Sequence, residues 1–190
     1  MTERYDFLVI GGGSGGIAAA RRAAEHGART ALIEARRLGG TCVNVGCVPK
    51  KVMWNTAHVA EVIRQAPDYG FSVASNNFDW PTIKEARDGY VRRLNGIYKK
   101  SLDASEVSLY TGWASVQTPQ TLRVDDHALQ ADHILIATGG HPTVPDIPGA
   151  QLGITSDGFF ELDHQPQSAL VIGAGYIATE LAGVLNSLGT

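Results

Sequence analysis

The two cysteines of the chain, Cys42 and Cys47, are the only ones in 190 residues, and four residues lie between them. A fully helical backbone would leave their Cα atoms roughly 8–9 Å apart, which is too far for a disulfide. A bridge would need the first cysteine in a distorted turn, permitted by Gly46, and a helix starting at Cys47 with Pro49 in its first turn. A helix N-terminus favours the thiolate form, so this arrangement is typical of a redox-active pair.

The cysteine spacing by itself leaves three other interpretations open. A structural disulfide over so short a loop would contribute only about 2 kcal/mol. A zinc site needs four ligands, and the six histidines are scattered without ligand spacing, so we expect no metal. Two ordinary free thiols are the third alternative. The flanking glycines, the Pro49–Lys51 segment and a glycine motif further upstream favour redox chemistry.

The composition is that of a soluble globular protein, with 44% hydrophobic and 18% charged residues. A net charge of −3 gives no electrostatic reason to expect binding to nucleic acid or to a membrane. Residues 1–6 lack a basic segment followed by an apolar run, so we expect no secretory leader and a cytoplasmic location. In that compartment a lasting cysteine bridge is more often catalytic than structural.

The segment before the cysteines has the pattern of a complete βαβ unit. Residues 7–10 form a short apolar run typical of a buried parallel strand. A glycine-rich turn at 11–16 and an alanine-rich helix at 17–26 follow, and Gly27 is expected to end the helix. Residues 30–34 predict the next strand.

Gly11, Gly13 and Gly16 fill a GxGxxG pattern between that strand and helix, and Glu34 ends the second strand. Glycines let the backbone approach a pyrophosphate, whose charge is favoured at the helix N-terminus. Glu34 would accept hydrogen bonds from the adenosine ribose hydroxyls. Nicotinamide and flavin dinucleotides share this fingerprint, so the motif alone does not choose between them.

The middle of the chain predicts two helices and several strands. Apolar residues recur at helical spacing over 47–65 and 79–102. Four short segments are expected to form an antiparallel meander, namely 107–110, 113–116, 121–124 and 128–130. Residues 131–140 then predict a buried strand that ends in a glycine turn.

A second dinucleotide fingerprint follows a stiff linker that contains Pro142, Pro145 and Pro148. Residues 168–172 predict a strand, and 173–178 carry the glycine motif with alanine in its third position. A helix is expected over 179–188. One strand and one helix make only the beginning of a domain.

The segment Gly39–Lys51 resembles the redox motif of the pyridine nucleotide–disulfide oxidoreductases, and the resemblance runs from Tyr5 to the last residue. It implies an α/β chain with a doubly wound, Rossmann-like FAD-binding domain, with an antiparallel meander and the redox disulfide, over 1–145. The start of a Rossmann-like NADPH-binding domain would occupy 146–190. The C-terminal dimerisation domain of the family is not in this sequence, and we expect the longer protein to be a homodimer.

The resemblance also implies roles for particular residues. Cys47 would face the flavin, and Cys42 would attack the substrate disulfide. Lys50 would approach the flavin, Glu180 would pair with that lysine, and Tyr176 would cover the flavin as a lid. Further cofactor contacts are implied for Gly11, Gly13, Ser14, Gly15, Gly16, Glu34, Thr41, Cys42, Ala114, Thr138 and Gly139 on FAD, and for Gly173, Gly175 and Ile177 on NADPH.

Substrate choice within the family is indicated by a few positions. Lysine at both positions of Lys50–Lys51 resembles the branch that reduces oxidised glutathione or trypanothione, and Ala18 with Arg21 resembles the glutathione enzymes. An arginine suits the carboxylates of glutathione and would repel the cationic linker of trypanothione. Ser14, Arg21 and Tyr98 are therefore the expected substrate contacts, and oxidised glutathione is the expected substrate.

The histidine–glutamate pair that protonates the leaving thiol in this family lies in the C-terminal domain of the other subunit and is absent here. We therefore expect this polypeptide by itself not to be a competent reductase. Two alternatives stay open. One is a related reductase of the trypanothione, dihydrolipoamide or mercuric type, and the other is a non-catalytic FAD-binding fragment.

Overall fold

The computed structural model describes residues 2–74 and 77–190, which form two compact units. The first unit combines residues 1–44 with 92–141, and the second combines 45–91 with 142–190. Residues 45–91 are thus compact together with the C-terminal part of the chain. The expected division into domains at residues 145 and 146 stays a prediction.

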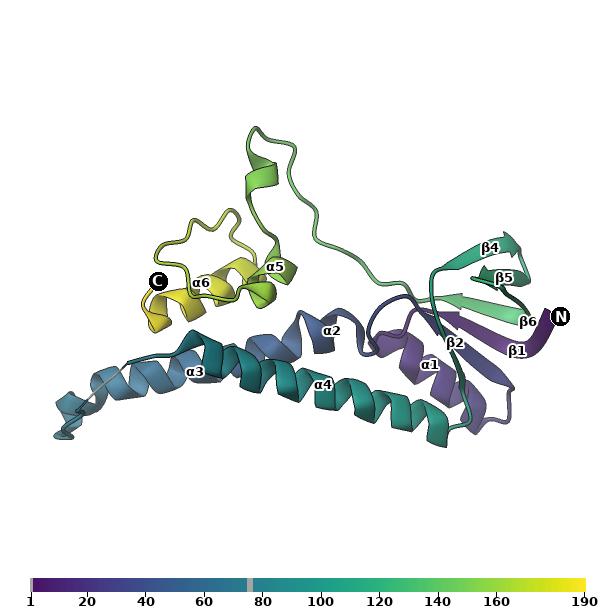
Figure 1. Cartoon of the computed structure of the whole chain (residues 1–190), viewed down its shortest axis with the longest axis horizontal. Coiled ribbons are helices and arrows are strands. Elements are labelled where there is room, and N and C mark those ends of the chain that lie inside the picture. The colour runs from purple at the N-terminus through teal and green to yellow at the C-terminus, as the bar shows by residue number, and fades with distance from the viewer. Residues whose placement is uncertain (1, 75–76) are drawn as a thin grey trace. The chain divides into compact units, whose positions relative to one another are not determined.

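The first unit is built on a six-stranded sheet with the order β3-β2-β1-β6-β5-β4 (Figure 1). Its strands are β1 (Thr2–Ile10), β2 (Thr30–Glu34), β3 (Ser108–Thr111), β4 (Ala114–Thr118), β5 (Thr121–Val124) and β6 (His127–Ile136). The first four in sheet order pair in parallel, and β6, β5 and β4 pair antiparallel. The predicted α/β class with a parallel, Rossmann-like sheet is confirmed.

Two details of the expected meander were wrong. Strand β3 does not join it but pairs in parallel with β2, where Leu109 lies opposite Leu32. The segments 128–130 and 131–136 belong to one strand, β6, which pairs with β5 on one side and with β1 on the other. The reason is that short alternating segments do not reveal their partners, and hydrogen bonding to distant strands decides the arrangement.

Alternation along β1 divides the core of the first unit between the two faces of the sheet. Val9 packs with Ile17 and Ala20 of α1 (Ser14–Glu25) and with Leu102 near the end of α4 (Trp80–Ala104). Leu8 belongs to the other cluster, which includes residues of β5 and β6. Each face of β1 therefore carries buried residues, as expected for a central parallel strand.

The turn between β1 and α1 brings backbone into close contact. A Cβ at Gly16 would overlap the carbonyl oxygen of Gly11, and a Cβ at Gly11 would overlap that of Ala137. Gly11 also has a φ of +110°, which L side chains rarely adopt. In contrast, a Cβ at Gly15 would meet nothing within 4 Å. The sequence pattern therefore corresponds to a real steric requirement at two of its positions.

The second unit is mainly helical. It contains α3 (Cys47–Gln65), η1 (Ala66–Tyr69), the first part of α4, η2 (Ala150–Leu152), α5 (Ser156–Glu161) and α6 (Tyr176–Leu188). Its core includes Met53 of α3, Trp80 of α4, Phe159 of α5 and Val184 of α6. The predicted helix over 47–65 agrees with α3 at both ends.

The expected strand at 168–172 was wrong, because these residues have no regular secondary structure. Leu170 is 89% exposed and Ile172 is 72% exposed. A strand is stable only when its N–H and C=O groups bond to a neighbour, and no strand pairs with this segment among residues 2–74 and 77–190. The helix after it, α6, is present and ends at Gly189 with a φ of +98°.

A polar cluster joins the C-terminal ends of α3 and α6. The Ser187 hydroxyl donates to Glu61 Oε1 at 2.7 Å, and Arg64 Nη1 donates to the same oxygen at 2.9 Å. Arg64 Nη2 also donates to the carbonyl of Ser187 at 2.7 Å. Hydrogen bonds from Ser187, the larger cause, and from Arg64 hold the pKa of Glu61 below its ordinary value.

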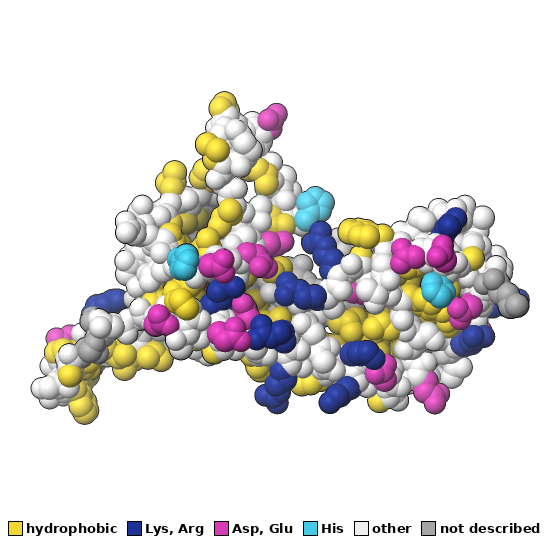
Figure 2. All heavy atoms as spheres, viewed as in Figure 1, with side chains coloured by type: hydrophobic (Ala, Val, Ile, Leu, Met, Phe, Trp, Pro, Cys, Tyr) yellow, Lys and Arg dark blue, Asp and Glu magenta, His cyan; other side chains and the backbone are white. Residues whose placement is uncertain are grey.

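The surface mixes charges of both signs, as the face drawn in Figure 2 shows. Several large apolar side chains are exposed along α3 and just after it, namely Val59, Val62, Tyr69, Phe71 and Val73. Among the residues that the structure describes, no helix is both long and apolar enough to cross a membrane.

Gly16→Ala should destabilise the first unit strongly, because its Cβ would be forced into the backbone of Gly11. We expect the free energy of unfolding to fall by about 2–3 kcal/mol, as for other substitutions that overpack a rigid contact. The matched control is Gly15→Ala, which enters open space and should change stability by less than about 1 kcal/mol. Urea denaturation measures both variants, and equal losses would contradict the steric argument.

Stability should also fall in acid through Glu61. Its pKa is lowered in the folded chain, so it contributes stability above its unfolded pKa of about 4.5, and this is lost as the pH falls through the folded value. We therefore expect the unfolding temperature to fall less steeply between pH 7 and pH 3 in Glu61→Gln than in the parent chain. A variant curve parallel to that of the parent throughout this range would refute the assignment.

Candidate functional site

The glycine-rich loop lies at the carboxyl edge of the parallel strands. Ile10 at the end of β1 is in register with Ile33 of β2 and Ile136 of β6, so these strands finish side by side. The N–H of Ala137 donates to the carbonyl of Ile10 at 2.8 Å, which brings the segment after β6 to the glycine loop. Thr138 and Gly139 follow at once, and Gly139 has a φ of +70°. Open α/β sheets bind ligands in this position.

The first turn of α1 begins within this loop. Gly13 is its N-cap with an extended backbone, and the first intrahelical bond runs from the N–H of Ile17 to the carbonyl of Gly13 at 2.9 Å. The N–H groups of Ser14, Gly15 and Gly16 therefore precede the first intrahelical bond and have no acceptor within the helix. Together with the open space at Gly15, they suit an anionic group such as a pyrophosphate.

Glu34 ties this loop together. Its Oε2 accepts from the N–H of Gly12 at 2.6 Å, and its Oε1 accepts from the N–H of Arg36 at 2.7 Å. Each carboxylate oxygen has a second lone pair, so both could still accept from ribose hydroxyls. Glu34 thus has a structural task that the sequence did not reveal, beside the ribose contact that stays predicted.

Ala114 follows this edge along the chain, and its strand pairs it with Val124 of β5, opposite the start of β6. The N–H of Gly112 donates to the carbonyl of Glu34 at 2.9 Å, and Ala114 starts β4 two residues later. The side chain of Ala114 is partly buried against the core cluster around Leu8. The expected contact at the adenine end of the cofactor stays a prediction.

Thr41 and Cys42 are carried to the glycine loop by α2 (Gly40–Asn44). The N–H of Gly39 donates to the carbonyl of Gly12 at 2.7 Å. A Cβ at Gly40 would lie 2.7 Å from the Cα of Gly13, so the two backbones are in close contact. The dinucleotide loop and the start of the cysteine segment are therefore one packed assembly within the first unit.

The two cysteines lie on either side of a helix break. Cys42 is in α2, which ends at Asn44, and Cys47 is the first residue of α3. Cys42 is partly buried and Cys47 is exposed. The predicted helix start at Cys47 is confirmed, with Gly46 as its N-cap and Pro49 buried in the first turn. Cys42 lies in a short helix, whereas a bridge to Cys47 was expected to need it in a distorted turn.

Lys50 and Glu180 form an ion pair in the second unit. Lys50 Nζ donates to Glu180 Oε1 at 2.9 Å, and the two side chains are 27% and 33% exposed. Lys50 is in the first turn of α3 and Glu180 in the second turn of α6, so the pair joins the two helices near their N-termini. The ion pair that the resemblance implied is present, while its role in the reaction stays a prediction.

The second fingerprint leads into α6 as its pattern predicts. Gly173 has a φ of +121°, and Gly175 is the N-cap of α6. A Cβ at either glycine would meet nothing within 4 Å, so the backbone is open to a ligand here. Tyr176 is 77% exposed and Ile177 is 43% exposed. These positions can hold a phosphate group at the helix N-terminus.

The expected substrate contacts have mixed surroundings. Ser14 is exposed at the start of α1. Arg21 Nε donates to Ser105 Oγ at 3.1 Å, and Tyr98 packs partly against the core cluster around Val9. The structure thus places Ser14 and Arg21 two helical turns apart, and it gives Tyr98 a packing role as well.

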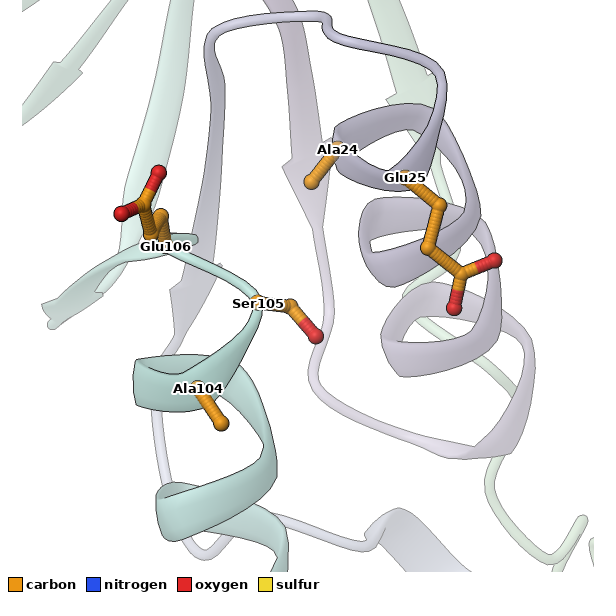
Figure 3. A pocket seen from close by; sticks show the side chains of 5 residues that line it. All are labelled: Ala24, Glu25, Ala104, Ser105 and Glu106. Atoms are coloured by element: carbon orange, nitrogen blue, oxygen red, sulfur yellow. The ribbon is translucent and has the colours of Figure 1, made fainter.

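A shallow pocket lies beside Ser105, between the ends of α1 and α4 (Figure 3). Ala24 and Glu25 line it from α1, and Ala104 and Glu106 line it with the serine. Its two carboxylates make it a poor site for a substrate that itself carries carboxylates. We therefore do not assign the substrate to it.

Among the described residues, neither a metal centre nor a tyrosine with a shifted pKa adds a second reactive site. Among residues 2–74 and 77–190, no three His, Cys, Asp or Glu side chains are grouped to hold a metal ion. Burial is the main cause that raises the pKa of Tyr110 far above its usual range, and hydrogen bonds with Tyr5 and Glu3 add to it. Tyr110 therefore keeps its proton and acts in packing.

Two asparagines beside the cysteine segment were not predicted from the sequence. Asn44 Nδ2 donates to the carbonyls of Gly40 and Leu38, and Asn95 Nδ2 donates to Leu38 and to Asn44 Oδ1. Asparagine is a poor residue for a helix interior. Asn95 in the middle of a long helical pattern was therefore the available indication of a tertiary role.

Comparison with known proteins gives the family. The model of the pyridine nucleotide-disulphide oxidoreductase family matches residues 5–190. Glutathione reductase of Schizosaccharomyces pombe is 54% identical over 100% of this chain and 43% of its own length. Glutathione reductase of Yarrowia lipolytica is 53% identical over 97% of this chain and 42% of its own length. The chain thus spans less than half the length of these relatives. It belongs to the pyridine nucleotide-disulphide oxidoreductase family.

Proposed function

We propose that this chain is the FAD- and dithiol-bearing part of an NADPH-dependent reductase of oxidised glutathione. One observation carries the proposal furthest. The glycine loop of the nucleotide motif packs directly against the turn that leads to Cys42, through Gly13 and Gly40. A dinucleotide bound at that loop would therefore lie beside a redox-competent thiol. Similarity to two glutathione reductases supports the choice of substrate.

The residues of the first unit fit FAD. Backbone contacts at Gly11 and Gly16 leave no room for side chains, and the N-terminus of α1 is open at Gly15. Glu34 would hold the ribose, and Thr138 and Gly139 follow the end of β6. When bound, the flavin would supply two-electron transfer between the nicotinamide and the disulfide.

The cysteines would carry out thiol–disulfide exchange. In the reduced chain, the Cys42 thiolate attacks one sulfur of oxidised glutathione, whose disulfide breaks as a mixed disulfide forms. The first glutathione leaves as a thiolate and takes up a proton. Cys47 then attacks the Cys42 sulfur, which releases the second glutathione and closes the Cys42–Cys47 disulfide. Two electrons pass from the dithiol to the substrate in this sequence.

Lys50 and Glu180 would act on the cofactor side. The ion pair holds the Lys50 ammonium one helical turn beyond Cys47, and its positive charge would favour electron-rich forms of a flavin ring bound beside it. Tyr176, exposed at the start of α6, would cover that ring. The open glycines of the second fingerprint, Gly173 and Gly175, would take NADPH. The longer protein is proposed to be a homodimer.

A visible spectrum tests the flavin and the thiols together. The chain purified with FAD should show a flavin band, and two-electron reduction should add a long-wavelength absorption from the thiolate beside the ring. Cys47→Ser should abolish that added absorption, because Cys47 is the thiol assigned to the flavin. Cys42→Ser is the matched control and should show this absorption before any reduction, because Cys47 then has no disulfide partner and can already be a thiolate. A chain that binds no flavin would rule out the proposal.

The substrate is tested by trapping the mixed disulfide. Reduced Cys47→Ser chain incubated with oxidised glutathione should gain one glutathione at Cys42, seen by mass spectrometry, because the second exchange step cannot occur. Cys42→Ser should gain far less at Cys47. Lipoamide and trypanothione disulfides serve as competitors, and a clear preference for either would reassign the substrate.

A further inference from the structure

We infer that Asn95 is a positioning residue for the Cys42 loop. It lies on the part of α4 that belongs to the first unit, and its side-chain hydrogen bonds are made within that unit. Its side-chain amide joins α4 to the turn that precedes Cys42. The inference deepens the proposed function and rests on it, since it concerns the thiol that the proposal makes reactive.

The turn at Leu38–Gly40 needs external support. Gly39 and Gly40 have φ values of +99° and +60°, so two successive residues are in the left-handed region. The Leu38 carbonyl precedes α2, which begins at Gly40, so it lies outside the hydrogen bonds of that helix and needs side-chain donors. A Cβ at Gly39 would also collide with the side chain of Val43, which prevents replacement of the glycine.

Two asparagine amides supply those donors. Asn44 Nδ2 donates to the carbonyl of Gly40 at 2.9 Å and to that of Leu38 at 3.1 Å. Asn95 Nδ2 donates to the same Leu38 carbonyl at 2.7 Å and to Asn44 Oδ1 at 3.0 Å. Asn95 therefore supports the turn directly and also orients the asparagine that closes it.

The side chain at position 95 must be a donor with two N–H groups. A carboxylate there would face the Leu38 carbonyl and Asn44 Oδ1, which are both acceptors. An apolar side chain would remove the donor to Asn44 Oδ1 and leave the Leu38 carbonyl with Asn44 as its remaining side-chain donor. The opposite side of the turn is held by the bond from Gly39 to Gly12, so Asn95 closes the assembly from the helix side.

The consequence concerns Cys42, which is two residues beyond Gly40 on the short helix that this network closes. Tyr98, a proposed substrate contact, lies one turn beyond Asn95 on α4. The asparagine therefore sets the position of the attacking thiol relative to the helix that would face the substrate. Loss of its amide should free the turn without altering α3, where Cys47 begins the helix.

The test measures the alkylation rates of the two thiols in the reduced chain, with iodoacetamide as the probe and mass spectrometry as the readout. Asn95→Ala should raise the rate at Cys42 by about tenfold, the size expected when two hydrogen bonds that close a local structure are lost. Cys47 is the internal reference and should change by less than about twofold. The matched control is Ser101→Ala, which removes a hydroxyl that donates to the carbonyl of Ile97 within the same helix.

Several results would overturn the inference. An unchanged Cys42 rate in Asn95→Ala would do so, as would the same rise in Ser101→Ala. Equal rises in the alkylation rates of both thiols would mean global unfolding of Asn95→Ala. In that case the Cys42 rate is measured in Asn95→Ser. Its hydroxyl can donate one hydrogen bond, so an intermediate Cys42 rate supports the inference and a rate like that of the parent chain refutes it. The alkylation rates need no flavin, so a chain that fails the spectral test still distinguishes these outcomes.

Discussion

The close backbone contact at the start of α1 is the constraint on which the rest of the first unit depends. Gly16 lies against the carbonyl of Gly11, and Gly11 lies against Ala137. With side chains at these positions, the helix would have to move away from the strand ends. Its N-terminal N–H groups would then no longer border the loop where Glu34 holds the backbone of Gly12. Steric contact thus creates the electrostatic site.

The cysteine segment extends the same principle. Gly40 touches Gly13, and side-chain amides support the turn that leads into α2 because the Leu38 carbonyl precedes the helix. Glycines permit the close approach, and asparagines replace the hydrogen bonds that such a turn cannot make for itself. A reactive thiol on a flexible loop would lose the orientation that exchange chemistry needs. The turn instead belongs to the packed part of the unit.

The second unit rests on contacts between α3 and α6. Lys50 and Glu180 join these helices near their N-termini, and Glu61 and Ser187 join them near their C-termini. Buried apolar residues such as Met53 and Val184 lie in the core that the two helices share. These contacts fix α3, which begins with the second cysteine, against α6, which begins in the second fingerprint. Two motifs that lie far apart in sequence are therefore packed together in this unit.

Periodicity and local chemistry were enough to predict α3 at both ends, because a glycine precedes it and proline and glycine follow. The strand at 168–172 was predicted from its apolar run and is absent, since a strand also needs a partner.

By itself, the sequence determined the nucleotide fingerprints, the helix start at Cys47 and the α/β class, because glycine sterics and helix periodicity act between neighbouring residues. Only the tertiary structure decided that β3 pairs with β2, that Glu34 binds the backbone of Gly12, and that Asn95 supports the turn before Cys42. The two hydrogen bonds among these contacts join residues that are 22 and 57 positions apart. Their geometry depends on packing of the whole unit, which no local pattern encodes.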